Sequence, residues 1–534
     1  MRILLRPPQL FAGHHSSQGA PASWVRCIMD TEATEETRKN SRELTVAVLG
    51  AGQWTLEAYA PGLQKFGRAW LLNHLEVRFL DPDARTRATL SSGLPVLKDV
   101  RLAQVFGLPP QQLTWHHNVA SGTVGKVTFN IVEGTGPGAL SGCMPDVVFV
   151  VNPPEHHMPS VRSWYSPGRW VVMEKPFWLT DVGVRACVLA AVDAVLKNCA
   201  NPCGLTCTHI AKVLKGAPSN ANMAANLQNL LANAHAPPDF VNAATSACTT
   251  KLEAIPMPGE LNVWANDVCA FDHYLWRLWS LKDRHREAVT QLGFGPLQRV
   301  TFRMCEYLDR FDDWPWANAR WQAGAIQDFA IHAAPLLQLL GSSASAGLPS
   351  CTWEDENGQR RHSAPTCGEW YPYVEFTQDD WRAFDLNASV GQPFSIDVGV
   401  GWRLATKRPL GLPDKFLLLE YQKGLLYADL AEPFQWRRAD CGSIDLCPPL
   451  EDRLSGYLFP AGGQTGARGY WTAVSEAPVH EMLRGVLTDR MTRVPPPSSG
   501  LMSLTGQPGW GQLPSAESVM EVLGSWDGAY RPHV

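Results

Sequence analysis

Short apolar segments recur along the first part of the chain and alternate with helical patterns. Several are hydrophobic at nearly every position, namely 44–49 (LTVAVL), 76–81 (EVRFLD), 126–132 (KVTFNIV), 146–151 (DVVFVV) and 169–173 (RWVVM). Strands of this kind are buried on both faces, because intervening helices cover both sides of a parallel sheet. We therefore predict an α/β fold with an N-terminal domain built on a parallel sheet.

The second half of the chain has a different pattern. Longer strands, some alternating and some joined by close turns, are expected at 297–304, 394–404 and 415–430, with a helix at 326–340. This favours a C-terminal α+β domain with a mostly antiparallel sheet. We expect a tail at 1–43, the parallel-sheet domain at 44–200, an insertion at 201–260 with a helix at 223–233, and the α+β domain at 261–534.

Composition and charge narrow the class of partner. The chain has 534 residues, 45% of them hydrophobic, and a net charge of −5. No basic run and no repeated basic and aromatic pattern occurs, so we expect no nucleic-acid partner. No apolar stretch reaches the roughly 18 residues that span a bilayer, so we expect a soluble protein without a membrane partner.

Cysteine usage and the first residues bear on the compartment. The 13 cysteines are scattered and odd in number, which is typical of a reduced intracellular protein. The tight cluster Cys199, Cys203, Cys207 and His209 matches no common zinc spacing, so we predict no metal site. Residues 1–29 have the composition of an organelle transit peptide, and an untargeted tail explains them equally well. The expected location is the cytoplasm, or a plastid or mitochondrion if the segment is a transit peptide.

The first strand ends in a glycine-containing turn that is a candidate cofactor site. Gly50 and Gly52 form G-x-G, followed by Gln53 and Trp54. The first glycine permits the tight turn, and the second lets the backbone approach a pyrophosphate at the N-terminus of a helix. The third small position of this fingerprint is Thr55, and a plain glycine turn is the alternative interpretation.

An acidic residue at the end of the second strand can read the ribose of a dinucleotide. Asp81 occupies that place, and its carboxylate can accept hydrogen bonds from both ribose hydroxyls. Arg85 and Arg87 follow and could instead hold the extra phosphate of NADP. The pattern favours NAD slightly and leaves NADP open. A helix N-cap before Pro82 is the alternative role for Asp81.

Several motifs in a fixed order identify a family resemblance. The fourth and fifth strands run into Asn152-Pro153-Pro154-Glu155-His156-His157 and Glu174-Lys175-Pro176-Phe177, and later segments read FDHYL (271–275), GPLQRVTFR (295–303) and GAIQDFAIH (324–332). Together they resemble the Gfo/Idh/MocA oxidoreductases and their structural relatives, the glucose-6-phosphate dehydrogenases. The resemblance covers most of 44–526, with the insertion outside it.

The resemblance implies a Rossmann domain that binds NAD or NADP, and hydride transfer from the hydroxyl or hemiacetal carbon of a sugar or sugar phosphate. It implies that Asn152, Pro153, Pro154, His157 and Glu174 join the cofactor site. His332 takes the role of general base, for which its pKa class is suited. By the same resemblance Asp328 binds the substrate hydroxyl and Lys175 offers its ammonium to the reacting oxygen. Asp272 orients the base, and His273 and Arg277 bind the substrate.

Two functions of different classes remain open at this point. Lys175, Asp272, Asp328 and His332 occur together, which favours an active NAD(P)-dependent dehydrogenase acting on CH–OH donors. The irregular fingerprint, the insertion and Pro335, which should kink the helix at 326–340, favour a non-catalytic dinucleotide-binding sensor. A true glucose-6-phosphate dehydrogenase using NADP is a narrower alternative, although Trp276-Arg277-Leu278 replaces its G-K-E. A homo-oligomer is left open.

Overall fold

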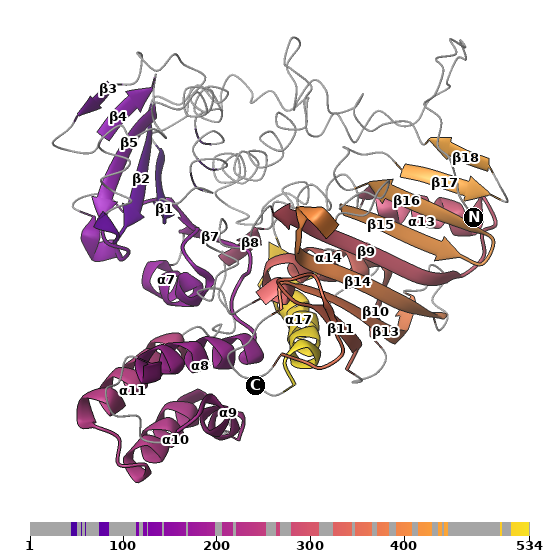
Figure 1. The fold of residues 1–534 in the computed structure, drawn as a ribbon. Coiled ribbons are helices and arrows are strands. Elements are labelled where there is room, and N and C mark those ends of the chain that lie inside the picture. Colours follow the sequence, from indigo (N-terminus) through magenta and orange to yellow (C-terminus); the bar gives the residue numbers. More distant parts are fainter. Residues whose placement is uncertain are drawn as a thin grey trace.

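The structure is a computed structural model in which two β-sheets and a group of helices lie beside one another (Figure 1). The residues it describes are 44–50, 55, 59, 63, 74–84, 114–116, 121–124, 127–140, 144–166, 169–197, 205–216, 220–252, 263–266, 279–308, 324–343, 348–365, 371–383, 391–407, 415–429, 436–440, 443–446, 502–504 and 514–532. The α/β and α+β classes predicted from the sequence are both confirmed.

Sheet A contains the parallel strands. Its order is β19-β8-β7-β6-β1-β2-β5-β4-β3. Parallel pairing joins β5 (Val127–Glu133), β2 (Leu75–Asp81), β1 (Leu44–Leu49), β6 (Val147–Val150), β7 (Trp170–Glu174) and β8 (Val263–Asn266). Antiparallel pairing adds β3 (Thr114–His116), β4 (Ser121–Val124) and β19 (Met502–Ser503). Because the strand order reverses at β1, the carboxyl ends of β1 and β6 form the switch point at which α/β sheets bind ligands.

The strands of sheet A follow from their composition. Every position of β6 and β7 is buried, as expected for strands with apolar residues throughout. The five strands predicted in this region are confirmed, with small shifts at their ends. Two short strands come from beyond residue 261, since β8 pairs with β7 and β19 pairs with β8. The proposed division into domains remains a prediction.

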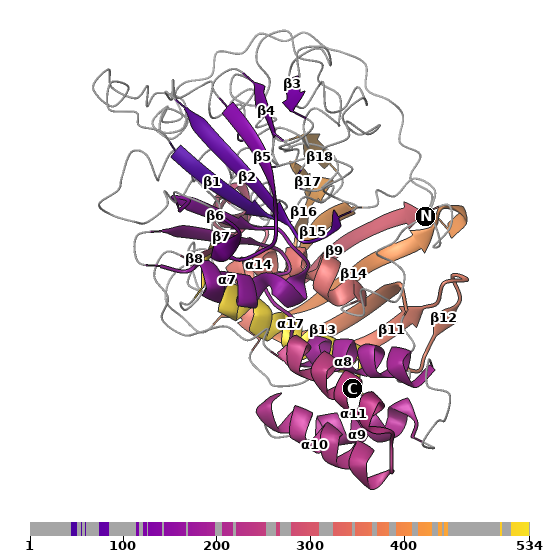
Figure 2. The ribbon, with the colours of Figure 1, turned by 90° about the vertical axis from the view of Figure 1, so that its left-hand side faces the viewer.

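Short helices follow the strands of sheet A, and a separate helical group comes next. The short ones are η3 (Pro137–Ala139), η4 (Pro154–His156) and α7 (His157–Trp164). The group comprises α8 (Asp181–Lys197), α9 (Cys207–Lys215), α10 (Asn220–Asn233) and α11 (Pro238–Leu252), which share an apolar cluster of their own (Figure 2). The predicted helix at 223–233 is therefore confirmed as α10. Among the described helices, none is both long and apolar enough to cross a membrane.

Sheet B is the mostly antiparallel sheet. Its order is β12-β11-β13-β14-β9-β15-β16-β17-β18, with β10 paired to β13. The strands are β9 (Leu297–Leu308), β10 (Gly341–Ser343), β11 (Ser350–Glu354), β12 (Arg360–Arg361), β13 (Tyr373–Ala383), β14 (Pro393–Leu404), β15 (Lys415–Tyr421), β16 (Gly424–Asp429), β17 (Trp436–Asp440) and β18 (Ser443–Leu446). The pairing of β14 with β9 is parallel. The segment predicted at 415–430 is a hairpin, β15 and β16.

Helices cover one face of sheet B. They are the π-helical turn η7 (Ile326–Ala330), α14 (Ile331–Leu340) and α17 (Ala516–Tyr530), with α13 (Trp279–Thr290) before β9 and the short turn η8 (Ala405–Lys407) after β14. Alternate residues of β14, namely Phe394, Ile396, Val398, Val400 and Trp402, are buried in the same core as these helices. Figure 2 shows α17 lying beside β13, between sheet B and the helical group.

Candidate functional site

The turn after β1 is built for close approach of the backbone. Gly50 has φ +97°, which an L side chain rarely adopts, and its N–H donates to Leu80 O at 2.8 Å. A Cβ at this position would lie 3.0 Å from the backbone nitrogen of Asn152. A glycine is therefore required where β1 and β6 end side by side.

Thr55 fills the place where the fingerprint has Gly or Ala. Its side chain is 1% exposed, and its hydroxyl donates to Gly50 O at 2.6 Å. The hydroxyl thus finds a partner inside the turn, so the larger residue is accommodated by a hydrogen bond to the same glycine. Tyr59 and Leu63 follow at intervals of four, and both are buried.

Asp81 ends β2 at the same edge of sheet A. Its Oδ1 accepts a hydrogen bond of 2.8 Å from the backbone N–H of Asp83, and the residue is 8% exposed. This contact closes the turn after β2, and it leaves the N-cap alternative a prediction, because the first helical residue is Ala84. One carboxylate oxygen is used in this turn, and the role of Asp81 towards a ribose also remains a prediction.

The N-P-P turn follows β6 and is held from within. The Asn152 amide donates to Ser160 Oγ at 2.9 Å, and Pro153 and Pro154 begin η4. His157 is 1% exposed, with Nε2 2.6 Å from Asn152 O and Nδ1 3.2 Å from Phe177 O. These two carbonyls belong to the turns after β6 and β7, so the imidazole joins both turns from the interior.

The E-K-P turn follows β7 and includes a cis peptide bond between Lys175 and Pro176. Glu174 is 4% exposed and accepts hydrogen bonds from the Tyr59 hydroxyl and, at 3.2 Å, from the Lys175 backbone N–H. Tyr59 comes from the segment after the glycine turn. The buried carboxylate therefore connects that segment to the residue that carries the ammonium group.

Lys175 reaches from sheet A to η7. Its Nζ donates to Asp328 Oδ1 at 2.7 Å and to Asp328 O at 3.2 Å, and the two side chains are 24% and 30% exposed. Two residues singled out separately in the sequence are thus in contact across 153 positions of chain. A half-exposed ammonium beside a carboxylate can hold a hydroxyl oxygen of a bound substrate.

His332 lies one turn further along the same helical segment. It is 3% exposed, and it follows the π-helical residues of η7 at the start of α14. Pro335 sits within α14 and has no N–H to donate to the carbonyl of Ile331. Pro335, where a bend is expected, therefore follows closely after the π-helical turn η7. Turns of this kind are frequent at functional sites.

Seven predicted site residues lie outside the described part of the chain: Gly52, Gln53, Trp54, Arg85, Asp272, His273 and Arg277. Four that sequence reasoning missed lie around the described ones, namely Tyr59, Thr180, Gln327 and Asp527. The helical spacing of Thr55, Tyr59 and Leu63 is a signal for the first of them. His209 in the cysteine-containing cluster serves a capping box with Thr206, and Cys199 and Cys203 lie outside the described residues.

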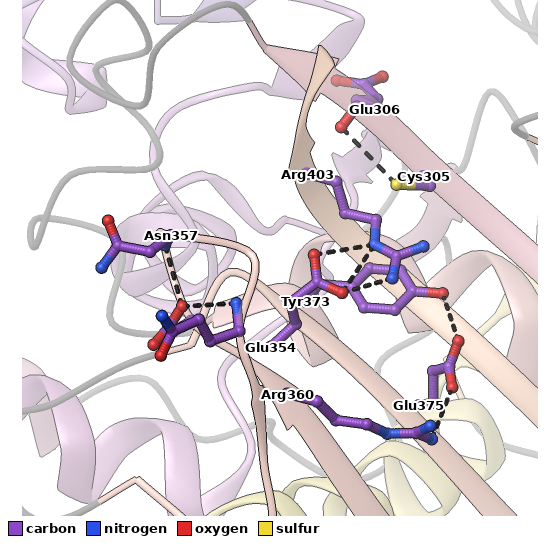
Figure 3. A network of polar contacts seen from close by, with 10 residues as sticks. Cys305, Glu306, Glu354, Asn357, Arg360, Tyr373, Glu375 and Arg403 are labelled. Carbon is purple, nitrogen blue, oxygen red and sulfur yellow. Dashed lines mark hydrogen bonds and ion pairs between the residues drawn. The ribbon is translucent and has the colours of Figure 1, made fainter. Parts of the chain in front are cut away.

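A second polar cluster, the sheet B network, is formed by side chains of β11, β13 and β14 (Figure 3). Arg403 pairs with Glu354 and stacks 4.3 Å above the Tyr373 ring, whose hydroxyl donates to Glu375 at 3.1 Å. Burial and the nearby Glu375 raise the pKa of Tyr373. A Cβ on Gly399 would lie 2.5 Å from the Tyr373 hydroxyl, so this glycine makes room for the ring.

Comparisons with known proteins give matches among solved structures. No protein-family model matches the chain, and no curated protein sequence matches it. An NAD binding oxidoreductase from Klebsiella pneumoniae is 13% identical, with 92% of this chain and 98% of that one covered at a TM-score of 0.43. The WlbA dehydrogenase from Bordetella pertussis, in complex with NADH and UDP-GlcNAcA, is 14% identical, with 92% and 97% covered at 0.45. Levoglucosan dehydrogenase, in complex with NADH and levoglucosan, is 10% identical, with 92% and 98% covered at 0.45.

Proposed function

We propose that the chain is an NAD(P)-dependent oxidoreductase that removes hydride from a CH–OH carbon of a sugar or sugar phosphate. The contact between Lys175 and Asp328 carries the proposal. It brings the lysine at the end of a parallel strand to an acidic residue four positions before a histidine, so an ammonium, a carboxylate and a candidate general base come from these two segments. The motif resemblance gives the same three residues their roles.

A dinucleotide fits the described edge of sheet A. Gly50 lies at the switch point between β1 and β6, where the absence of a side chain lets its turn pack against the backbone of Asn152. Asp81 lies at the neighbouring strand end, where the ribose of such a cofactor is read. Asn152 Oδ1 is buried with no hydrogen-bond partner among the described residues, so the turn after β6 retains an acceptor. When bound, the nicotinamide supplies the acceptor for hydride.

Each side chain of the site has its own role in the proposed reaction. The Lys175 ammonium donates to the reacting oxygen and stabilises its alkoxide character. The Asp328 carboxylate accepts a hydrogen bond from a substrate hydroxyl and keeps Lys175 in place. His332 removes the hydroxyl proton at a ring nitrogen, a task that suits an imidazole near neutral pH. Glu174, held by Tyr59, fixes the backbone of Lys175.

A panel of sugars and sugar phosphates, glucose 6-phosphate included, tests the proposal with NAD and NADP in parallel. We expect NAD(P)H absorbance to rise with at least one member and to stay flat with the Lys175→Ala variant. Tight NAD(P)H binding without turnover of any member would instead support a dinucleotide-binding sensor. Absence of binding would overturn both functions.

A further inference from the structure

A buried polar cluster lies next to the Lys175–Asp328 pair and has no role in the chemistry described above. It consists of Thr180, Gln327 and Asp527, which are 5%, 0% and 0% exposed. The Thr180 hydroxyl donates to Asp527 Oδ2 at 2.5 Å, and Gln327 Nε2 donates to Thr180 Oγ1 and, at 3.1 Å, to Asp527 Oδ2. We call these three residues the clamp.

The clamp joins the same two segments that the catalytic pair joins. Thr180 lies in the connection from β7 to α8, downstream of Lys175, and Gln327 directly precedes Asp328. A single contact between two segments leaves them free to pivot about it, whereas two adjacent contacts also fix their relative orientation. The clamp is therefore placed to set the geometry of the pair.

The Thr180 hydroxyl uses all of its donor and acceptor positions. Its Oγ1 accepts from Gly183 N at 2.9 Å at the start of α8, accepts from Gln327, and donates to Asp527. A hydroxyl offers one donor and two acceptor positions, so all three are used. A Cβ on Gly183 would lie 2.5 Å from Gln327 Nε2, so the glycine keeps open the space that the amide occupies.

Asp527 links the clamp to sheet B and α14 through helix α17. It belongs to α17, which is tied to sheet B by a 3.1 Å hydrogen bond from Trp526 Nε1 to Gln378 and to α14 by a 2.7 Å hydrogen bond from Gln338 to Ser518 Oγ. Arg531 lies 3.7 Å from the other oxygen of the Asp527 carboxylate. The last described helix thus connects the C-terminal sheet to the residues beside the site.

We propose that Thr180, Gln327 and Asp527 are positioning residues that hold η7 against the end of β7 and thereby keep Asp328 in contact with Lys175. The inference rests on the proposed function for its catalytic meaning, but the contact itself can be measured without any substrate. Small displacements of a catalytic group lower the rate strongly, by as much as about 100-fold for about 1 Å.

The test measures the rate at which Lys175 is methylated by formaldehyde and cyanoborohydride, followed by mass spectrometry and normalised to the exposed Lys407 of the same chain. Thr180→Val removes the hydroxyl at nearly constant volume, and Thr180→Ser restores it. Asp328→Asn gives the rate for a broken pair. Thr249→Val is the matched control, because it removes an exposed hydroxyl on α11.

We expect Thr180→Val to raise the Lys175 rate towards the Asp328→Asn value by about two- to tenfold, the range set by losing the one hydrogen bond that joins Thr180 to Gln327 of η7. Thr180→Ser and Thr249→Val should stay near wild type. If Thr180→Val fails to fold, Gln327→Leu provides the same comparison, since it leaves the Thr180 cap of α8 intact.

An unchanged Lys175 rate in folded Thr180→Val and Gln327→Leu would overturn the proposal, even if both variants melt at lower temperature. With an active substrate, the same variants should lower kcat and leave KM for the cofactor unchanged. A raised Lys175 rate in a protein that binds no NAD(P)H would support the clamp while refuting the proposed function.

Discussion

Two partly buried ion pairs, one at the end of sheet A and one within sheet B, differ in their geometry. Lys175 and Asp328 connect the end of sheet A to η7, and the ammonium contacts one carboxylate oxygen at 2.7 Å. Arg403 and Glu354 both lie in sheet B, on β14 and β11, and the guanidinium contacts both oxygens of the carboxylate (Figure 3). The side chains are 24% and 30% exposed in the first pair and 22% and 12% in the second.

The difference lies in what each geometry allows. A guanidinium that bonds both oxygens and stacks on Tyr373 is held in one orientation, and both of its strands belong to one sheet. An ammonium can exchange partners, because its three donors rotate about a flexible stem. In the proposed function, Lys175 transfers a hydrogen bond from Asp328 to a substrate oxygen while the fold stays unchanged. We expect the first pair to matter for activity and the second for stability.

The largest effect should follow loss of the base. His332→Asn should lower kcat by about 10²–10⁴-fold, the usual contribution of a general base, while NAD(P)H binding stays near wild type. Lys175→Ala should also lower kcat strongly but reduce the free energy of unfolding by about 1 kcal/mol or less, since the pair is partly exposed. Steady-state kinetics and urea unfolding measure the two quantities. An active enzyme whose kcat survives His332→Asn would remove the catalytic assignment.

Acid should lower the free energy of unfolding through His285, which contacts sheet B. Burial lowers the pKa of His285 to about 4, and the imidazole contacts the Tyr421 hydroxyl of β15 at 2.8 Å. The folded state disfavours the charged form, so this contribution to stability is full above pH 6.5 and is lost as pH falls towards 4. The loss should reach about 3 kcal/mol by linkage.

Urea unfolding across that pH range checks this expectation. The decline should be shallower in His285→Asn than in wild type, and His362→Asn, at an exposed histidine, should follow wild type. Identical slopes in His285→Asn and wild type would show that other groups control the acid response.

Breaking the second ion pair should affect stability alone. Arg403→Ala leaves Glu354 without its guanidinium and uncovers the Tyr373 ring, so the free energy of unfolding should fall by about 2 kcal/mol. Its kcat should equal that of wild type, in contrast to Lys175→Ala. A loss of activity at constant stability would mean that the sheet B network takes part in the site.

The smallest effect concerns cofactor choice. If Asp81 accepts hydrogen bonds from the ribose, Asp81→Ala should narrow a preference for NAD over NADP by roughly tenfold, the value of a charged hydrogen bond. Dissociation constants for NADH and NADPH provide the ratio. A wild type that strongly prefers NADPH would contradict the role given to Asp81.

Local pattern was enough for the main strands and for some of the site. Continuous apolar runs located β1, β6 and β7, because strands buried on both faces have few polar positions. The motif resemblance placed Lys175 and Asp328 in one site, and the structure brings the two side chains into contact. Thr55 departed from the fingerprint, yet its hydroxyl bonds the very glycine that begins the turn.

The remainder depends on contacts that no local pattern encodes. Gln327 and Asp527 meet across 200 positions of chain, and neither has a spacing that marks it. The strands β8 and β19 are too short for a recognisable pattern, so their place in sheet A follows only from pairing. The two backbone carbonyls beside the His157 ring follow strands that are far apart in the sequence, so no local pattern indicates them, and the predicted contact of His157 with the cofactor stays a prediction.

Titration of NADH into the protein tests the central claim most directly, that the end of β1 forms a dinucleotide site. Wild type should bind, and Gly50→Val should lose binding, because the side chain would meet the backbone of Asn152 and φ is +97°. Gly138→Val is the matched control, since a Cβ there meets nothing within 4 Å. A folded Gly50→Val that binds NADH as well as wild type and Gly138→Val would contradict the account.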